Sequence, residues 1–270
     1  MDANFNKKRP PALAGSWYPS DPRRLEAQIE LYLEQARNEG ARPTQQPSAL
    51  VVPHAGLVYS GLTAAHAFLS VQEAPNRVIL MGPSHRVGFQ GISAGTYSHY
   101  SCPLGDLPVD RKAIEKLLLD GLVSSRLEAH HEEHCLEMML PFIISLWGKV
   151  PILPFLVSRA QPAEVTHLLE ELCRAGDLIC ISSDLSHFLT YDKARVRDFH
   201  TLDTITDGRW DELGPHDACG YTAIAGLIKL AERRNLVASR LDYRNSGDTG
   251  GDRDRVVGYG ALAYTPVDSK

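Results

Sequence analysis

Short uninterrupted apolar runs, each followed by proline or by polar residues, are the clearest pattern along the chain. Residues 49–52, 77–83 and 177–182 show little alternation between apolar and polar positions. Strands of this kind are typical of a parallel sheet that is covered on both faces, because neither face meets water. The pattern predicts an α/β protein with a buried, mostly parallel or mixed central sheet.

Segments with apolar residues at helical spacing alternate with these runs. Asp21 followed by Pro22 matches the preferred start of a helix. Further helices are predicted over residues 62–69, 110–119, 162–174 and 191–206. A last helix is expected to begin after an N-cap at Asp217, which would place Cys219 in its first turn.

Four more strands are predicted outside the three central runs. They cover residues 91–97, 150–157, 236–243 and 256–264. The second of these contains two prolines, and proline cannot donate a hydrogen bond to a neighbouring strand. This strand is therefore expected at the periphery of the sheet.

Polar side chains that can bind a metal or move protons follow all three central runs. His54 follows the first run, His85 follows the second, and Asp184 and His187 follow the third. In open α/β sheets the carboxyl ends of parallel strands share one rim, and ligands bind there. The four side chains are therefore expected to form a shared site.

The composition indicates one conventional globular domain over residues 1–270, with residues 1–9 as a loose N-terminal tail. Of the 270 residues, 43% are hydrophobic, which is ample for a buried core. The net charge of -5 comes from interspersed charges, without a basic stripe that would bind a nucleic-acid backbone. No apolar run approaches the ~18 residues of a membrane span. We therefore expect a cytoplasmic protein with no nucleic-acid or membrane partner.

Five cysteines without C-x-x-C spacing argue against a disulfide framework and against a four-cysteine zinc site. The usual state of a free cysteine is a buried, inert thiol. Cys219 is expected to differ, because the dipole at the amino end of a helix lowers the pKa of a thiol in the first turn. Its thiolate would then be available to a metal or for chemistry.

Two hydrolase patterns are weaker alternatives. His130, Glu133 and His134 match the H-x-x-E-H signature of inverted zinc proteases. That signature needs a continuous helix and a further ligand downstream, whereas Pro141 limits the helix that can form here. Residues 82–85, Gly-Pro-Ser-His, lack the G-x-S-x-G turn of a serine hydrolase. Neither class is therefore the preferred interpretation.

Six short motifs occur in one order along the chain. They are Ala14-Gly-Ser-Trp-Tyr18, Pro53-His-Ala-Gly56, Gly82-Pro-Ser-His85, Glu133-His-x-x-Glu137, Ser182-Ser-Asp-x-x-His187 and Cys219-Gly220. Together they resemble the Memo family, which in microbes is called AmmeMemoRadiSam system protein B, and the resemblance runs from near Arg9 to Tyr264. It implies a single-domain three-layer α/β/α sandwich, similar to the fold of the class III extradiol non-haem iron dioxygenases.

The resemblance also implies roles for individual residues. It places His54, His85 and Cys219 around a redox metal, with the expected catalytic residues close by. These catalytic residues are His134, Glu137, Asp184 and His187. His130 and His131 fall outside the family motifs and are expected at the surface.

A cysteine ligand shifts the metal preference toward Fe(II), which we expect, with Cu(I) or zinc as alternatives. Three functions then stay open. The first is a metal-dependent oxidoreductase, such as an oxygenase for a small planar molecule. The second is a component that works with radical SAM and AMMECR1-like protein partners, as the microbial family name implies. The third is a module that binds a small molecule or a peptide in a pocket lined by Trp17 and Tyr59.

Overall fold

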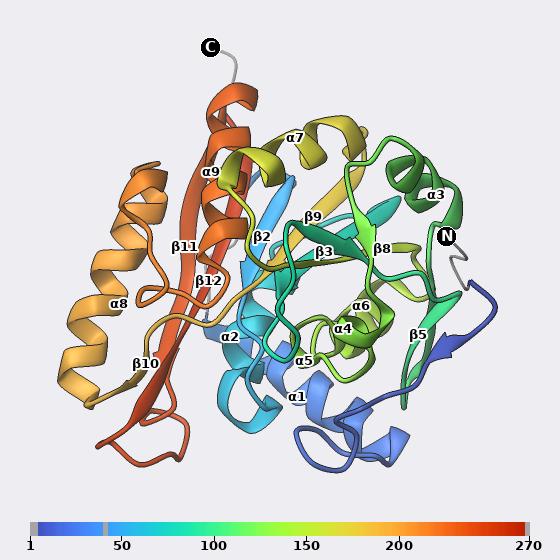
Figure 1. Cartoon of the computed structure of the whole chain (residues 1–270). Helices are drawn as coiled ribbons and strands as arrows, with labels where there is room; N and C mark the ends of the chain where they lie inside the picture. Colours follow the sequence, from blue (N-terminus) through green and yellow to red (C-terminus); the bar gives the residue numbers. More distant parts are fainter. Residues whose placement is uncertain (1–4, 40–42, 268–270) are drawn as a thin grey trace.

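A computed structural model describes residues 5–39 and 43–267 and has a mixed sheet at its centre (Figure 1). Nine strands of the described residues form this sheet, in the order β10-β12-β2-β9-β3-β8-β4-β7, and β11 also pairs with β12. Their bounds are β2 Ala49–Val52, β3 Arg77–Pro83, β4 Ile92–Ala94, β7 Ser124–Ser125, β8 Ile152–Val157, β9 Asp177–Ser182, β10 His187–Leu189, β11 Leu236–Asn245 and β12 Val256–Pro266. A small second sheet contains β1 Lys8–Arg9, β5 His99–Cys102 and β6 Gly105–Pro108.

Four neighbouring strands in the middle of the large sheet, β2, β9, β3 and β8, run parallel. Every residue of β2 and β9 is buried. The strands on either side, β12 and β4, run antiparallel to β2 and β8. The predicted buried runs in a mostly parallel or mixed sheet are therefore confirmed.

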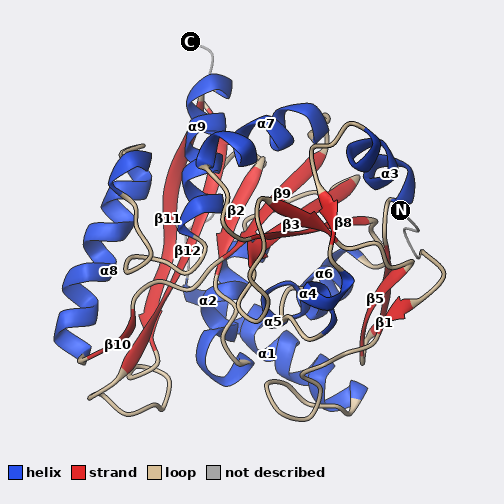
Figure 2. Cartoon of the chain, in the orientation of Figure 1, coloured by secondary structure: helices blue, strands red, loops and turns tan. Residues whose placement is uncertain are grey.

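Helices cover both faces of the sheet, which gives a three-layer sandwich (Figure 2). α1, α2 and α6 pack together on one face, whereas α7 and α9 pack against each other on the other face, with α8 beside β11 and β12. The bounds are α1 Pro22–Glu39, α2 Leu57–Leu69, α3 Arg111–Leu119, α4 Leu127–His131, α5 His134–Glu137, α6 Leu140–Trp147, α7 Pro162–Leu172, α8 Tyr191–Thr206 and α9 Tyr221–Arg234. None of the described helices is both long and apolar enough to cross a membrane. The expected single-domain α/β sandwich is confirmed.

β8 lies inside the sheet and not at the periphery that its two prolines predict. It pairs with β3 on one side and with β4 on the other, and all its residues are buried. Pro151 precedes the strand, and the carbonyl of Pro154 accepts from the N–H of Gly95, directly after β4 ends. Because the N–H and C=O groups of a strand residue point to the same side, the missing N–H of Pro154 faces the end of β4. Proline is tolerated there because the pairing stops at that point.

Residues 5–9 are attached to the body of the protein and do not form the predicted loose tail. They include β1, which pairs with β5. The side chain of Arg9 is 1% exposed, and its guanidinium donates to the carboxylate of Glu137 and to two backbone carbonyls beside α4 and α5. A buried guanidinium requires such partners, and they fix the segment in place. Residues 1–4, the rest of the predicted tail, lie outside the described residues.

His130 is buried, which corrects its predicted surface position, whereas His131 is exposed. Nδ1 of His130 lies 2.8 Å from the Tyr100 hydroxyl, and its Nε2 lies 3.2 Å from the carbonyl of Ser93. Burial lowers the pKa of His130 to about 3, so the ring is neutral. The ring therefore serves the packing of α4 against the sheet.

Candidate metal centre

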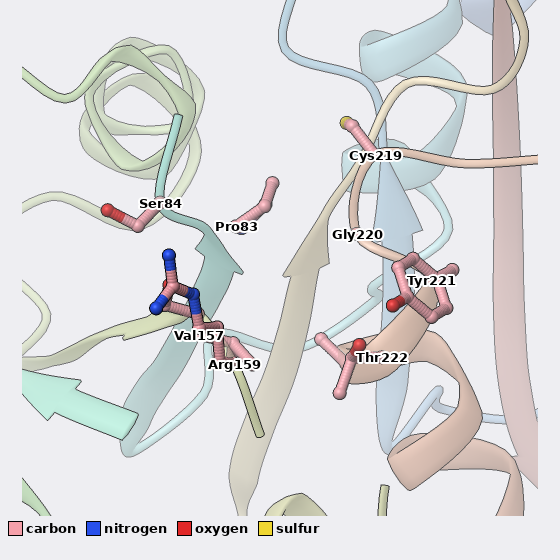
Figure 3. A pocket seen from close by; sticks show the side chains of 10 residues that line it. Pro83, Ser84, Val157, Arg159, Cys219, Gly220, Tyr221 and Thr222 are labelled. Carbon is pink, nitrogen blue, oxygen red and sulfur yellow. The ribbon is translucent and has the colours of Figure 1, made fainter. Parts of the chain in front are cut away.

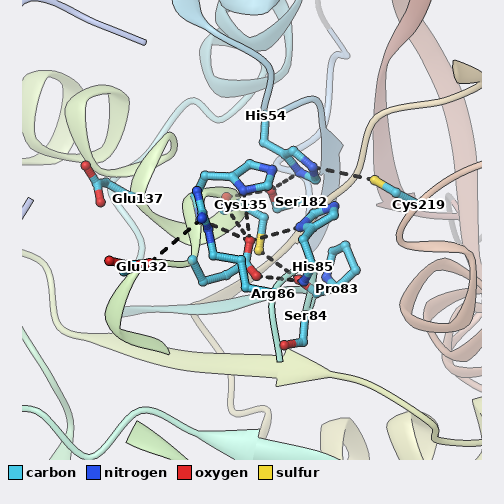
Figure 4. Close-up of polar contacts among 12 residues, drawn as sticks. His54, Pro83, Ser84, His85, Arg86, Glu132, Cys135, Glu137, Ser182 and Cys219 are labelled. Atoms are coloured by element: carbon cyan, nitrogen blue, oxygen red, sulfur yellow. Dashed lines mark hydrogen bonds and ion pairs between the residues drawn. The ribbon is translucent and has the colours of Figure 1, made fainter. Parts of the chain in front are cut away.

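The carboxyl ends of the three central strands meet at one rim of the sheet, as the sequence predicts. His54 follows β2, His85 follows β3 and Asp184 follows β9. The short helix α5 packs beside β3 and begins at His134. Figure 4 shows the side chains of His54 and His85 close together at this rim, with Cys219 on one side.

His54, His85 and His134 form a compact group of potential ligands. One ring nitrogen from each lies within 4.8 Å of the others. The ring centroids are 5.1 Å apart for His54 and His85, 5.2 Å for His54 and His134, and 4.3 Å for His85 and His134. Imidazoles grouped in this way suit zinc, copper, iron or nickel.

Hydrogen bonding fixes the tautomer of His54. Its Nδ1 lies 2.8 Å from the hydroxyl of Ser182, and this hydroxyl donates to the backbone carbonyl of Cys135 at 2.7 Å. A hydroxyl has a single proton, so Ser182 must accept the Nδ1–H of His54. The lone pair of His54 is therefore on Nε2, the nitrogen that lies 3.5 Å from the sulfur of Cys219.

Glu133 contacts the other two imidazoles and orients that of His85, a role that the sequence analysis does not assign to it. Its Oε1 lies 2.9 Å from Nδ1 of His85 and 3.1 Å from Nδ1 of His134. The same carboxylate accepts the backbone N–H groups of His85, His134 and Cys135. An ionised carboxylate only accepts, so His85 directs its Nδ1–H toward it and keeps its lone pair on Nε2, while the ring of His134 lies beside the same oxygen without a hydrogen bond of this kind among the described residues. The signal in the sequence is a glutamate at the N-cap of a helix that begins with histidine.

The electrostatics of the site favour neutral rings at His54 and His134 beside the ionised carboxylate of Glu133. Burial, reinforced by the neighbouring histidines, lowers the pKa of His54 well below its usual value and that of His134 to about 3. Burial by itself would raise the pKa of Glu133, but its hydrogen bonds and its attraction to His85 and His134 outweigh burial and bring the pKa to about 2. At neutral pH these rings are thus in the form that binds a metal.

Cys219 precedes helix α9. The sequence predicts it in the first turn of that helix, and this prediction is wrong. α9 begins at Tyr221 with Gly220 at the N-cap, and the predicted N-cap Asp217 accepts a hydrogen bond in the preceding loop. A Cβ atom on Gly220 would lie 2.7 Å from that of Ser183, so only glycine permits this approach to the end of β9. Packing against β9 therefore decides where the helix begins.

The low pKa expected for Cys219 is not found. Burial, followed by the nearby carboxylate of Asp184, raises the pKa of the thiol to about 12. The sulfur accepts the backbone N–H of Asp184 at 3.3 Å and lies 3.5 Å from Nε2 of His54. Among the residues that the structure describes, Cys219 is outside the group of three histidines. Its role as a metal ligand stays a prediction, and a cation would have to displace the thiol proton.

Asp184 and His187 occupy different positions at the same rim. Asp184 is 4% exposed, burial raises its pKa, and its Oδ1 accepts the backbone N–H of His54 at 2.7 Å. His187 begins β10 and is exposed, and its Nδ1 donates to the carbonyl of Leu185 at 2.8 Å. Asp184 thus holds the main chain at His54, while Nε2 of His187 keeps a lone pair for proton transfer. The catalytic roles of both residues stay predictions.

Glu137 points away from the histidines (Figure 4). Its carboxylate pairs with Arg9 at 2.6 Å and accepts from the hydroxyl of Tyr18 at 2.5 Å and from the backbone N–H groups of Ala12 and Leu13. These contacts attach the N-terminal segment to α5. The catalytic role predicted for Glu137 is therefore without a supporting contact in the described part of the chain, and it stays a prediction.

Trp17 and Tyr59, the predicted substrate-binding residues, line a cavity of about 500 Å³. The ring of Trp17 also lies 4.7 Å from that of His134, so Trp17 is a wall shared by the cavity and the histidine group. Tyr259 extends the apolar surface of the cavity, and Arg255 provides a cation at its wall. A cavity of this size and character can hold a small planar molecule.

A second group of potential ligands, His85, Glu133 and Cys135, shares a histidine with the first. It fits a metal less well. The buried thiol of Cys135 donates to the carbonyl of Pro83 at 3.2 Å, and burial raises its pKa strongly. Glu133 already accepts ring and backbone N–H groups. The three histidines, of which His54 and His85 keep a free Nε2 lone pair, are therefore the better candidate centre.

Comparison with known proteins places the chain in a family. A family model described as Memo-like protein matches residues 9–263. A MEMO1 family protein from Sulfolobus acidocaldarius is 34% identical over 280 residues, which cover 95% of this chain and 99% of the relative. Relatives of the same description from Methanosarcina mazei and Desulfurococcus amylolyticus are 32% and 31% identical, with 94% and 96% of this chain and 98% and 99% of each relative covered. The chain therefore belongs to the Memo family.

Proposed function

We propose that this chain is a metal-dependent protein with a dioxygenase-like pocket, redox active through iron or copper at the rim of the sheet. One observation carries the proposal. Three imidazoles converge, and two of them, His54 and His85, have Nδ1 hydrogen-bonded and an Nε2 lone pair that is left for a cation. Lone pairs gathered in a largely buried place are unfavourable unless a proton or a metal lies between them.

His54 and His85 are the first two proposed ligands, and Cys219 is the third. Metal–sulfur and metal–nitrogen bonds of about 2.3 and 2.0 Å at tetrahedral angles would place the two ligand atoms about 3.5 Å apart. The sulfur of Cys219 and Nε2 of His54 are 3.5 Å apart, which suits a shared ion. His134 is close enough to act as a further ligand. Sulfur in the ligand set favours Fe(II), with Cu(I) or zinc as alternatives.

The surrounding residues would bind and position a substrate. A bound Fe(II) ion would supply electron transfer and Lewis acidity at this rim. His187 would move protons through Nε2, because the carbonyl of Leu185 occupies its Nδ1. Trp17 and Tyr59 would hold a planar molecule beside His134. Asp184 would keep the main chain of His54 in place.

Anaerobic loading with Fe(II) or Co(II), followed by metal analysis, tests the proposal. The wild-type protein should take up metal in stoichiometric amounts, and His54→Ala and His85→Ala should each lose it. Cys219→Ser should remove the sulfur-to-cobalt absorption band, whereas Cys173→Ser, a matched change of a half-buried cysteine after α7, should leave the band unchanged. Full metal retention by both histidine variants would exclude this centre.

His134→Gln separates two arrangements of the centre. If His134 is a ligand, the variant should bind Co(II) more weakly and the visible spectrum should change. If it is a catalytic residue beside the metal, the variant should keep the metal and lose turnover in a screen for oxygen uptake with catechol-like and indole-like compounds.

A second candidate function is the binding of a peptide or small molecule without catalysis. The cavity beside Trp17 and Tyr59 favours it, because its walls are largely apolar and it adjoins the surface. This function predicts tight binding by metal-free protein and by His54→Ala alike. Oxygen uptake that depends on both metal and added compound would favour the first function instead.

A further inference from the structure

A second hollow lies between the ends of β3 and β8 and the start of α9 (Figure 3). Its volume is about 240 Å³, and the ends of β3 and β8 and the first residues of α9 line it. Cys219 belongs to its wall, and the sulfur of this residue is also 3.5 Å from Nε2 of His54. One side chain therefore connects the hollow with the proposed metal centre.

The side chains around this hollow offer donors and positive charge. Arg159 follows β8, and its exposed guanidinium has no partner among the described residues. Thr222 lies across the hollow from it on α9 and is only 9% exposed, yet its hydroxyl also has no partner within the described chain. The lining residues include no carboxylate. A hydroxyl without a protein partner on the wall of a hollow is free to bond a ligand there.

The main chain of α9 adds two more donors. The N–H groups of Gly220 and Tyr221 are used by acceptors outside the hollow. Those of Thr222 and Ala223, which line it, have no acceptor in the part of the chain that the structure describes. The 14 residues of α9 also give this end of the helix a partial positive charge of about half a unit. The backbone and the side chains thus both offer hydrogen-bond donors and positive charge to a ligand.

We propose that this hollow binds an oxyanion, a carboxylate or phosphate group, and that it holds the acidic group of the substrate. Arg159, Thr222 and the first amides of α9 all donate, which suits a ligand group that only accepts. The hollow is smaller than the ~300 Å³ at which pockets for whole drug-sized ligands begin, so it holds a head group. The remainder of the molecule would pass Cys219 toward the histidines. The substrate role rests on the proposed function, whereas oxyanion binding does not.

Titration of metal-free, isotope-labelled protein with inorganic phosphate and, separately, with benzoate tests the proposal. Either anion should move the amide signals of Thr222 and Ala223 in a saturable way, and the stronger of the two identifies the chemical source. Arg159→Gln should weaken that binding about tenfold, because it removes a charge-assisted hydrogen bond. Thr222→Val, which keeps the shape of the side chain, should weaken it several-fold. Arg174→Gln, a control at an exposed arginine just before β9, should have no effect.

Two outcomes would overturn oxyanion binding. One is the absence of saturable shifts at Thr222 and Ala223 with both anions. The other is an equal loss of binding in Arg159→Gln and Arg174→Gln, which would indicate general attraction to a charged surface.

The substrate role is tested separately from the metal centre. Anion binding that persists in His54→Ala supports the hollow even if the metal proposal fails. In Co(II)-loaded wild-type protein, the bound anion should change the visible spectrum, because Cys219 contacts both sites. Anion binding without any spectral change would overturn the substrate role and leave the oxyanion site intact.

Discussion

Glu133 and Glu137 lie at the two ends of the same short helix, α5, and both carboxylates are buried. Glu137 meets a permanent cation, Arg9, and donors from the N-terminal segment. Glu133 meets the ring N–H of His85, the ring of His134 and backbone N–H groups. The two carboxylates are equally hidden from water, but their partners differ in kind.

The two environments differ in whether the partners of the carboxylate keep a lone pair that a metal could use. The partners of Glu137 direct their donors to its carboxylate and attach the N-terminal segment to the body of the protein. The imidazole of His85, hydrogen-bonded to Glu133 through Nδ1, keeps a lone pair on Nε2. Burial of a carboxylate therefore does not distinguish a structural role from a functional one. The ability of its partners to bind a further ligand does.

The largest effect on folding is expected from Glu137→Ala. It leaves the guanidinium of Arg9 buried without its carboxylate, which destabilises a protein by about 3–5 kcal/mol. Urea denaturation of metal-free protein measures this loss. Glu30→Ala, which removes the exposed partner of Arg37, is the matched control and should change the free energy of unfolding by about 1 kcal/mol or less. Similar losses in the two variants would contradict the structural role of Glu137.

Glu133→Gln should act mainly on the metal. The amide nitrogen of glutamine cannot accept a hydrogen bond. If it replaces Oε1, the ring of His85 loses its acceptor, and if it replaces Oε2, the backbone N–H of His85 does, so the orientation of His85 is no longer fixed. We expect metal affinity to fall about 10–100-fold, measured by competition with a chelator. The free energy of unfolding should fall by only about 1–2 kcal/mol, since one N-cap acceptor is lost. A variant that binds metal normally but is less stable than Glu137→Ala would reverse the comparison.

Ser182→Ala should have a smaller effect on the same property. It removes the acceptor of the Nδ1–H of His54 and leaves the ring free to change tautomer. We expect metal affinity to fall about tenfold, at the lower end of the range for such supporting residues. Nitrogen chemical shifts of the metal-free protein should show a mixture of the two tautomers of His54. A single unchanged tautomer in the variant would show that Ser182 does not fix the ring.

The smallest effect is expected from Trp17→Phe. The indole is 36% exposed, so the free energy of unfolding should change by less than about 1 kcal/mol. Metal content should stay at the wild-type level, because the indole packs against His134 at a tilt and offers it no hydrogen bond among the described contacts. Binding of an aromatic compound, followed by tryptophan and tyrosine fluorescence, should weaken severalfold. Loss of metal in this variant would mean that the contact between Trp17 and His134 also keeps the metal ligands in place.

The pattern of apolar and polar residues was enough to predict the layers of the fold and much of the rim. Residues 49–52, 77–83 and 177–182 are buried strands, and His54 and His85 follow two of them. These features are local, because a strand and the residue after it are adjacent in the chain and an apolar run has few alternatives. The order of six short motifs also indicated the Memo family, which comparison with known proteins confirms.

Which polar groups meet, and which charge each then carries, depends on contacts between distant parts of the chain. Glu133 and His85 are 48 residues apart and Arg9 and Glu137 are 128 apart, so neither contact follows from local spacing. The interior place of β8 depends on where β4 stops, and the start of α9 depends on the approach of Gly220 to β9. The raised pKa of the Cys219 thiol likewise follows from burial and from the carboxylate of Asp184, which follows β9. The charge that a group carries depends on its surroundings in space.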